Sequence, residues 1–295
     1  MDIQHIRYFL AVAKNKSFSK AADKLFVTQP ILTRCIKNLE RELGIPLIIR
    51  STKSFALTDA GEALAQYGAL LLQQHQDIYR RIRDVADAKV GEILISCPGT
   101  LLDLYFPKRV TRYRTEHPGI HISVRERGSV EVEQDILDGV ADMGLVMLPL
   151  ERESALNIYP IVQDEIQVIV RRGHPFEKLA EVHVSQLKGL DIITYDNTTT
   201  LNNMFCALCR EHGFAPNLVF QSMMTGFILD TIAYGDCVGV LPAPMSKRAE
   251  GLIGIPLRPG LPWNIAIITK KGRYLSSAAA DFLTFCQKTF ASETE

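Results

Sequence analysis

A row of polar side chains recurs every four residues along a segment near the N-terminus. Gln29, Thr33 and Lys37 share one side of a helix with this spacing, and Arg34 lies beside them. Amides, hydroxyls and basic groups can bond to base edges or phosphates. A major groove about 12 Å wide accepts one helix. The row therefore predicts a helix that reads double-stranded DNA, whereas the alternative is a solvated face on an ordinary three-helix domain.

Short helices must position that row. A first helix is expected to end near Asn15, and Ser17 is a good N-cap for a second. Thr28 can cap the third helix, with Pro30 in its first turn, where the missing N–H costs nothing. Gly44 is expected to end this helix. The side of the third helix that faces the core is predicted to consist of Leu32, Ile36, Leu39 and Leu43.

The next segment, residues 45–57, alternates around a polar tip and predicts a β-ribbon. Arg50 and Lys53 on this ribbon are placed to meet the DNA backbone or the minor groove. The complete set expected to contact DNA is Thr28, Gln29, Pro30, Thr33, Arg34, Lys37, Arg50 and Lys53.

The distribution of charge agrees with a nucleic-acid partner for the N-terminal segment. The whole chain of 295 residues has no net charge, yet residues 1–60 hold ten Lys or Arg against five acids. The remaining residues therefore carry a net charge of −5. A basic segment joined to an acidic body indicates that one part meets phosphate and the other does not.

A long helix is expected over residues 59–89. Leu64, Leu71, Ile78 and Val85 recur every seven residues, which is the spacing of a coiled-coil seam. We expect this helix to form a homodimer. The second seam position is irregular, so the sequence assigns no full register, and a helix packed on its own domain is the alternative.

From Gly91 onward, apolar strands alternate with helical segments, among them a single helix expected over 101–116, which predicts an α/β body with parallel sheets. β segments near 156–170 interrupt the alternation, and a strand at 264–270 returns near the end. This order predicts two lobes with a cleft between them. The expected domains are 1–58, 59–89 and 90–295, the last divided into lobe I (90–162 and 266–295) and lobe II (163–265).

Two loops rich in hydroxyl groups follow predicted strands and precede predicted helices. In an α/β lobe, ligands bind beyond the carboxyl ends of the strands. Hydroxyl and backbone N–H groups there could hold a small carboxylate, although Ser and Thr are also ordinary N-caps. No Lys or Arg lies in these loops, which disfavours a multiply charged ligand. The expected ligand contacts are Pro98, Gly99, Thr100, Leu101, Met147, Thr199, Thr200, Met224 and Phe227.

Other chemistry is less well supported. Cys206 and Cys209 form C-x-x-C inside an amphipathic helix without a second pair, so buried packing is expected rather than zinc or redox chemistry. The sequence has no catalytic motif, and neither a cofactor nor a metal is expected. It also has no membrane-spanning run and no secretory signal, so we expect a cytoplasmic protein without a membrane partner.

The segment SFSKAADKLFVTQPILTRCIKNLERELGIPLIIRSTKSFALTDAG, residues 17–61, resembles the LysR-type transcriptional regulators almost throughout. Landmarks farther along, including Phe106-Pro107, His117-Pro118 and GDCVGVLP at 235–242, resemble the effector domain of that family. Thr33 stands where Ser is common, and Ile31 and Cys35 also depart from the family pattern, so half-site preference can differ.

The resemblance implies an N-terminal winged helix-turn-helix, a linker helix and a two-lobed effector domain like a periplasmic binding protein. It also implies a homodimer or homotetramer that binds an operator with dyad symmetry, with half-sites about 34 Å apart. RNA polymerase is a further candidate partner. Some members of the family sense peroxide with a cysteine pair, but Thr200 stands where the reactive partner of such a pair would align.

Three alternatives to a ligand-responsive regulator remain at this point: a redox-responsive member of the same family, a solute-binding protein and an enzyme on an α/β scaffold. The body at 91–295 alone resembles a solute-binding protein, but the missing signal peptide and the DNA-reading helix argue against that class. The lack of a catalytic constellation argues against an enzyme.

Overall fold

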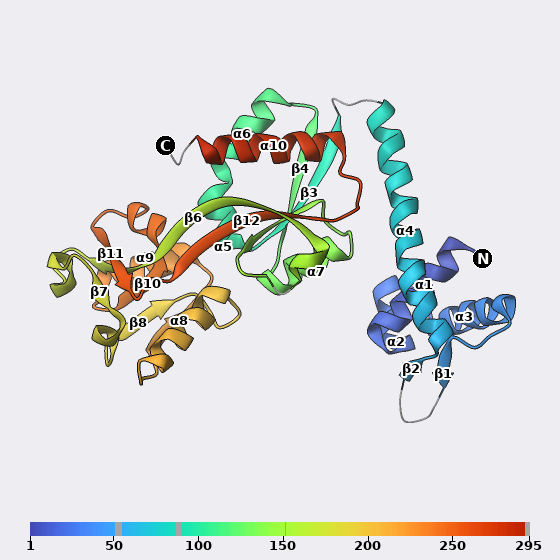
Figure 1. Cartoon of the computed structure of the whole chain (residues 1–295), viewed down its shortest axis with the longest axis horizontal. Coiled ribbons are helices and arrows are strands. Elements are labelled where there is room, and N and C mark those ends of the chain that lie inside the picture. The colour runs from blue at the N-terminus through green and yellow to red at the C-terminus, as the bar shows by residue number, and fades with distance from the viewer. Residues whose placement is uncertain (51–54, 87–89, 151, 293–295) are drawn as a thin grey trace. The chain divides into compact units, whose positions relative to one another are not determined.

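The computed structural model describes residues 1–50, 55–86, 90–150 and 152–292 (Figure 1). The chain divides into two compact units, Met1–Ala86 and Asp87–Glu295. The first unit consists, in chain order, of α1 (Ile3–Asn15), α2 (Phe18–Leu25), α3 (Gln29–Leu43), β1 (Ile48–Arg50), β2 (Phe55–Leu57) and α4 (Asp59–Ala86). This order agrees with the three short helices, the ribbon and the long helix predicted from the sequence.

Local hydrogen bonds set the ends of these helices. The Ser17 hydroxyl accepts from the backbone N–H of Lys20 at 3.3 Å, as expected of an N-cap. Gly44 ends α3 with a φ of +70°, a conformation that glycine adopts without strain. Thr28 occupies the N-cap position of α3, but its side chain makes no capping hydrogen bond to the described residues. The predicted position of the N-cap is therefore confirmed, but the capping hydrogen bond expected from the Thr28 hydroxyl is not formed among these residues.

The core of the first unit lies where the three short helices meet. Leu32, Ile36 and Leu39 of α3 are fully buried against α1 and α2, where small Ala21 and Ala22 let the helices approach closely. Leu43 is 42% exposed, so the predicted buried stripe ends one turn earlier than expected. Leu43 is the last residue of α3, where the chain turns away at Gly44.

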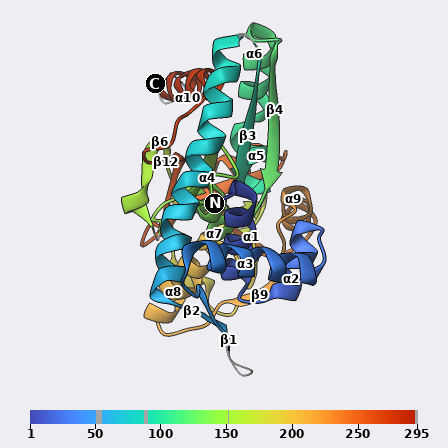
Figure 2. The same ribbon diagram turned by 90° about the vertical axis from the view of Figure 1, so that its right-hand side faces the viewer.

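The ribbon is held against the end of α3. β1 and β2 pair antiparallel, with Ile48 opposite Leu57, and the chain continues from β2 into α4 (Figure 2). The Glu40 carboxylate accepts from the backbone N–H of Leu47 at 3.0 Å. A Cβ on Gly61 would lie 2.1 Å from the Leu47 carbonyl oxygen, so only glycine fits where α4 passes the ribbon. These contacts make the ribbon the wing of the helix-turn-helix.

The second unit is an α/β body. Its helices are α5 (Gly99–Tyr105), α6 (Pro107–Glu116), α7 (Ser129–Leu137), α8 (Thr200–Glu211), α9 (Thr225–Tyr234) and α10 (Ser277–Ala291). Its strands are β3 (Gly91–Cys97), β4 (Ile120–Glu126), β5 (Met143–Met147), β6 (Leu156–Arg171), β7 (Val182–His183), β8 (Asp191–Thr194), β9 (Asn217–Gln221), β10 (Val238–Pro242), β11 (Leu252–Arg258) and β12 (Pro262–Lys270). The short 3₁₀ turns are Glu153–Ala155, Pro175–Lys178, Val184–Leu187 and Ala243–Lys247.

Each of the two lobes contains a group of parallel strands. The main strand order is β4-β3-β5-β12-β6-β10-β8-β9, in which β3 pairs parallel with β4 and β5, and β8 pairs parallel with β9 and β10. In lobe I, α6 and α10 lie on one face of the sheet and α7 on the other (Figure 1). The predicted α/β class and its two lobes are confirmed.

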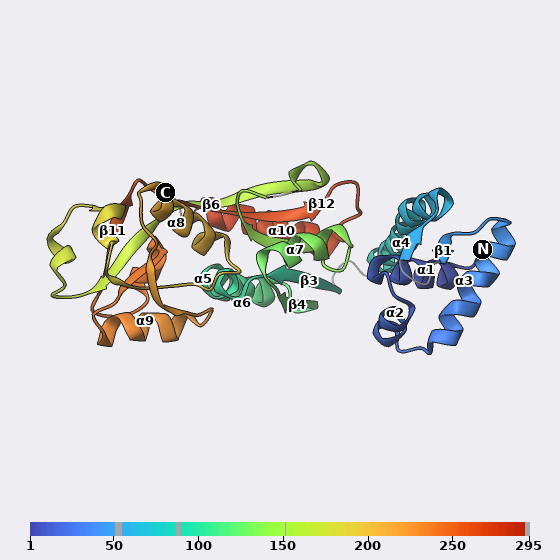
Figure 3. The same cartoon turned by 90° about the horizontal axis from the view of Figure 1, so that it is seen from below.

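Two long antiparallel strands join the lobes. β6 pairs with β12 on the lobe I side and with β10 and β11 on the lobe II side, and Figure 3 shows β6 and β12 side by side. The expectation of separate β segments near 156–170 is wrong, because β6 is one strand of 16 residues. Both predicted lobe boundaries, 162/163 and 265/266, fall within these joining strands.

One predicted helix is broken in two. The sequence led us to expect a single helix over 101–116, but α5 ends at Tyr105 and α6 begins at Pro107. Proline has no N–H and clashes with the preceding turn, which explains the break. Among the described helices, none combines the length and apolar composition needed to cross a membrane.

Candidate functional site

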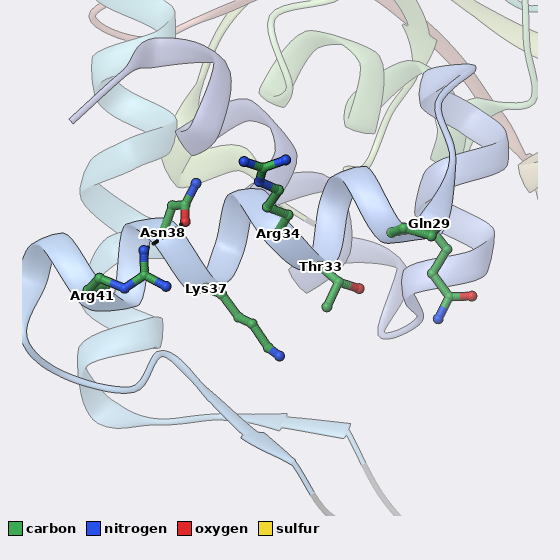
Figure 4. A pocket seen from close by; sticks show the side chains of 7 residues that line it. Gln29, Thr33, Arg34, Lys37, Asn38 and Arg41 are labelled. Atoms are coloured by element: carbon green, nitrogen blue, oxygen red, sulfur yellow. Dashed lines mark hydrogen bonds between the residues drawn. The ribbon is translucent and has the colours of Figure 1, made fainter.

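The exposed face of α3 forms a shallow groove lined by Gln29, Pro30, Thr33, Arg34, Lys37, Asn38 and Arg41. Figure 4 shows Gln29, Thr33 and Lys37 on one edge of this face, with Arg34 and Asn38 on the other edge. On the opposite side of the helix, Leu32, Ile36 and Leu39 are fully buried. The polar side chains of this face therefore point toward solvent, where a single external partner can reach them.

Two hydrogen bonds orient side chains on this face. The Ser19 hydroxyl of α2 donates to Gln29 Oε1 at 3.0 Å, which leaves the Gln29 amide N–H groups free to point outward. Arg41 Nη1 donates to Asn38 Oδ1 at 3.3 Å. Oriented side chains lose less conformational entropy when they bind than free ones do.

Sequence reasoning missed Asn38 and Arg41. Arg41 follows Lys37 by four residues, so the same i, i+4 row that begins at Gln29 could have included it. Of the other predicted DNA contacts, Thr28 and Pro30 are exposed at the start of α3. Lys53 and the side chain of Arg50 lie outside the described residues.

The predicted seam of α4 divides into two parts. Leu71 and Ile78 are 43% and 55% exposed, and Tyr67, Leu70, Tyr79 and Ile82 add further exposed apolar area to this helix. Leu64 instead packs against the core of the first unit. The side chain of Val85 lies outside the described residues. The described side chains therefore leave an apolar strip along α4 without a covering element in its own unit.

A second candidate site is a small cavity between the lobes of the second unit. Its lining comes from the loops after β3 and β8, from the starts of α5, α7 and α8, and from β5 and β12. The lining residues are Pro98, Thr100, Leu101, Ser129, Met147, Tyr195, Thr199, Thr200, Leu201 and Trp263. The cavity volume is about 20 Å³, which is the space of one water molecule.

Six of the predicted ligand contacts lie together in this cavity: Pro98, Thr100, Leu101, Met147, Thr199 and Thr200. The other three, Gly99, Met224 and Phe227, line a separate open groove with Asp103 and Glu126. Met224 and Phe227 are 71% and 45% exposed on their own lobe. The structure thus brings most of the predicted set into one cavity and places the remaining three in an open groove lined by both lobes.

The hydroxyl groups of the cavity differ in how they are used. Thr199 caps α8, because its Oγ1 accepts from the Asn202 N–H at 3.3 Å and donates to the Asp196 carbonyl at 2.8 Å. The hydroxyls of Thr100 and Thr200 have no hydrogen-bond partner within the described part of the chain. These two hydroxyls, one in each lobe, are therefore available to a ligand.

Sequence reasoning missed four lining residues: Ser129, Tyr195, Leu201 and Trp263. Ser129 begins α7 shortly after β4 ends, so the rule that found Thr100 could also have found it. Nothing in the sequence next to Trp263 in β12 marks it as a lining residue. Trp263 Nε1 donates to Tyr105 Oη at 2.7 Å, and burial raises the pKa of Tyr105 to about 12. The phenol is therefore neutral at physiological pH.

The C-x-x-C cysteines belong to α8 and are free thiols. Cys206 Sγ donates to Asn202 Oδ1 at 3.3 Å. Burial raises the pKa of both thiols, that of Cys209 to about 12, so both are protonated at neutral pH. A protonated thiol is a poor nucleophile and a poor metal ligand. Among the described residues, no group of three or more His, Cys, Asp or Glu could hold a metal ion.

Two family models match the chain. Residues 3–62 match the model described as "Bacterial regulatory helix-turn-helix protein, lysR family", and residues 86–291 match "LysR substrate binding domain". Among curated proteins, the uncharacterized HTH-type transcriptional regulator YwbI of Bacillus subtilis is 32% identical over 286 residues, which cover 96% of this chain and 95% of YwbI.

Solved structures share the fold over the whole length of the chain. A mutant of full-length BenM is 27% identical, has a TM-score of 0.60, and the match covers 100% of this chain and 97% of BenM. Full-length CbnR in complex with its target DNA has a TM-score of 0.55 and 22% identity, with 98% of this chain and 100% of CbnR covered.

Proposed function

The chain belongs to the LysR family of transcriptional regulators, and from this premise we propose that it binds operator DNA through α3 and responds to a small carboxylate bound between the lobes of its second unit. The proposed role is regulatory rather than catalytic, and such a protein would act in the cytoplasm, where its operator and RNA polymerase are found.

One observation carries the DNA-binding part of the proposal. α3 buries Leu32, Ile36 and Leu39 completely and leaves its polar row to solvent. The amide of Gln29 can pair with adenine, and Arg34 can bond to guanine O6 and N7. Lys37 and Arg41 extend the row with positive charge, which favours phosphate. The wing residues Arg50 and Lys53 complete the proposed DNA contacts.

A second copy of the chain is part of the proposed function. Leu71 and Ile78 expose apolar area on α4, and an amphipathic helix gains stability when such a strip packs against another helix. A two-fold dimer presents two copies of α3, and a tetramer presents two such pairs. The operator is then expected to have dyad symmetry, with half-sites about 34 Å apart.

The cavity supports the ligand class. Thr100 and Thr200 offer free hydroxyls at the starts of α5 and α8, where backbone N–H groups favour an anion. Pro98, Leu101 and Met147 supply an apolar wall. No Lys or Arg contributes to the lining, which disfavours a ligand with several charges. A carboxylate of ordinary size needs more than the present volume, so the lobes or their side chains must move apart to admit it.

Two measurements test this function. The full-length chain, incubated with a randomised pool of duplexes, should enrich a sequence with dyad symmetry; a pool without any enriched sequence would refute the DNA-binding role. Separately, a panel of small monocarboxylates should contain at least one that raises the unfolding temperature, because a ligand of the native state stabilises it. If no monocarboxylate raises that temperature and a dicationic or neutral compound tested beside the panel does, the ligand class is wrong.

A further inference from the structure

Phe26 lies in the turn between α2 and α3 and combines two unfavourable features. It is 96% exposed, the most exposed large apolar side chain among the described residues. Its backbone φ is +54°, in the left-handed region, which only Lys16 shares among the described non-glycine residues. The position therefore carries an aromatic side chain in a conformation that suits glycine or asparagine better.

The turn itself does not require the ring. The Phe26 N–H donates to the carbonyls of Ala22 and Asp23, and the Val27 N–H donates to the Ala22 carbonyl at 3.1 Å. These backbone bonds close the C-terminal end of α2 whatever side chain residue 26 carries. At 96% exposure, the ring also contributes almost no apolar burial to the fold. Within the described residues, neither the turn nor the core of the first unit uses the ring, which leaves it open to a contact outside the chain.

The place of Phe26 in the sequence indicates which contact this is. Phe26 stands three residues before Gln29, the first residue of the polar row on α3. Three residues span at most about 10 Å, so a partner that reaches Gln29 comes within range of the ring. In helix-turn-helix proteins, the N-terminal residues of the second helix contact base edges. The turn that holds Phe26 leads directly into that end of α3.

We infer that Phe26 contacts DNA. This inference rests on the proposed DNA-binding function and adds a residue to it. The ring packs against an apolar part of the duplex, which is either the face of a deoxyribose or the methyl group of a thymine at the edge of the half-site. Contact with DNA removes the ring from water, so binding supplies the apolar burial that the ring lacks in the unbound protein. Proteins often keep strained or exposed residues at binding surfaces, where they lower the stability of the fold but serve function.

The test compares variants of the full-length chain on the duplex that the wild-type chain enriches from a random pool. Phe26→Gly and Phe26→Asn both suit the left-handed turn, and we expect them to bind that duplex about tenfold more weakly. Their unfolding temperatures should equal or exceed that of the wild type. Phe26→Tyr keeps the ring and is the matched control, with affinity close to wild type.

Replacing each thymine of the duplex by uracil then separates the two apolar sources. If uracil at one position weakens DNA binding by the wild type but not by Phe26→Gly, the ring contacts the methyl group of that thymine. If no position has this effect, the ring contacts deoxyribose. Unchanged affinity of Phe26→Gly and Phe26→Asn would overturn the inference, and so would an equal loss in Phe26→Tyr. If the wild type enriches no duplex, the proposed function itself fails and this inference falls with it.

Discussion

Arg248 and Asp103 join the two lobes of the second unit. Asp103 belongs to α5 in lobe I, and Arg248 follows the 3₁₀ turn Ala243–Lys247 in lobe II. Arg248 Nη1 donates to the Asp103 carboxylate, and Nη2 donates to the Asp103 backbone carbonyl at 2.6 Å. A single guanidinium thus holds the first helix of lobe I against lobe II, next to the residues that line the cavity.

We expect Arg248→Met, which keeps the apolar stem and removes the charge, to lower the free energy of unfolding by about 0.5–1 kcal/mol. The pair is one-third to one-half exposed, so its contribution stays in the range of surface ion pairs. Chemical denaturation at increasing NaCl measures this difference, which should shrink as salt screens the charges. In a double-mutant cycle with Asp103→Asn, additive losses would show that the two side chains do not interact.

Thr100→Val should reduce the response to the ligand. Valine has the shape of threonine without its hydroxyl, so the buried start of α5 keeps its packing while the ligand loses one hydrogen bond. We expect the affinity for a stabilising monocarboxylate to fall by about 0.5–1.5 kcal/mol, measured by isothermal titration calorimetry. Affinity for the enriched duplex should not change. Calorimetric affinity equal to that of the wild type would remove Thr100 from the ligand site.

Ile78→Asp should weaken self-association through α4. Ile78 is 55% exposed, so the substitution leaves the fold of the first unit intact and places a charge in the proposed seam. We expect the dimer dissociation constant to rise by about tenfold or more, measured by sedimentation equilibrium, because burying an unpaired charge is costly. Ala69→Asp adds the same charge at an exposed position of α4 outside the heptad row and is the control. Equal association of both variants with the wild type would place the self-association surface elsewhere.

The sequence predicted the parts of the fold that depend on local pattern. Ser17 and Gly44 marked helix ends, and the i, i+4 row of Gln29, Thr33 and Lys37 marked an exposed face. The rule that ligands lie beyond strand ends placed Thr100 and Thr200 in one cavity, although they are 100 residues apart in the sequence. These patterns succeed because each depends on the conformation of a single element or on a general property of parallel sheets.

The remaining features depend on contacts between distant residues. Trp263 reaches the cavity only because β12 returns from the end of the chain to pair with β5 and β6, and its own neighbours in sequence do not reveal this. Met224 and Phe227 follow a strand end, as Thr200 does, yet they do not line the cavity, because the start of α9 lines a different, open groove. Leu64 keeps the heptad spacing but packs against the core of the first unit instead of lying in the exposed strip. No local pattern distinguishes these outcomes.

The central claim is that the exposed face of α3 reads base sequence. Its most direct test is the ratio of dissociation constants for a scrambled duplex and for the enriched duplex, measured for the wild type, Arg34→Ala and Arg172→Ala. Arg172 is an exposed arginine of the second unit and controls for the loss of one positive charge. We predict that Arg34→Ala weakens binding to the enriched duplex by about 1–3 kcal/mol and lowers this ratio, while Arg172→Ala leaves the ratio unchanged. A ratio that stays at the wild-type value in Arg34→Ala would contradict base reading by this residue of α3.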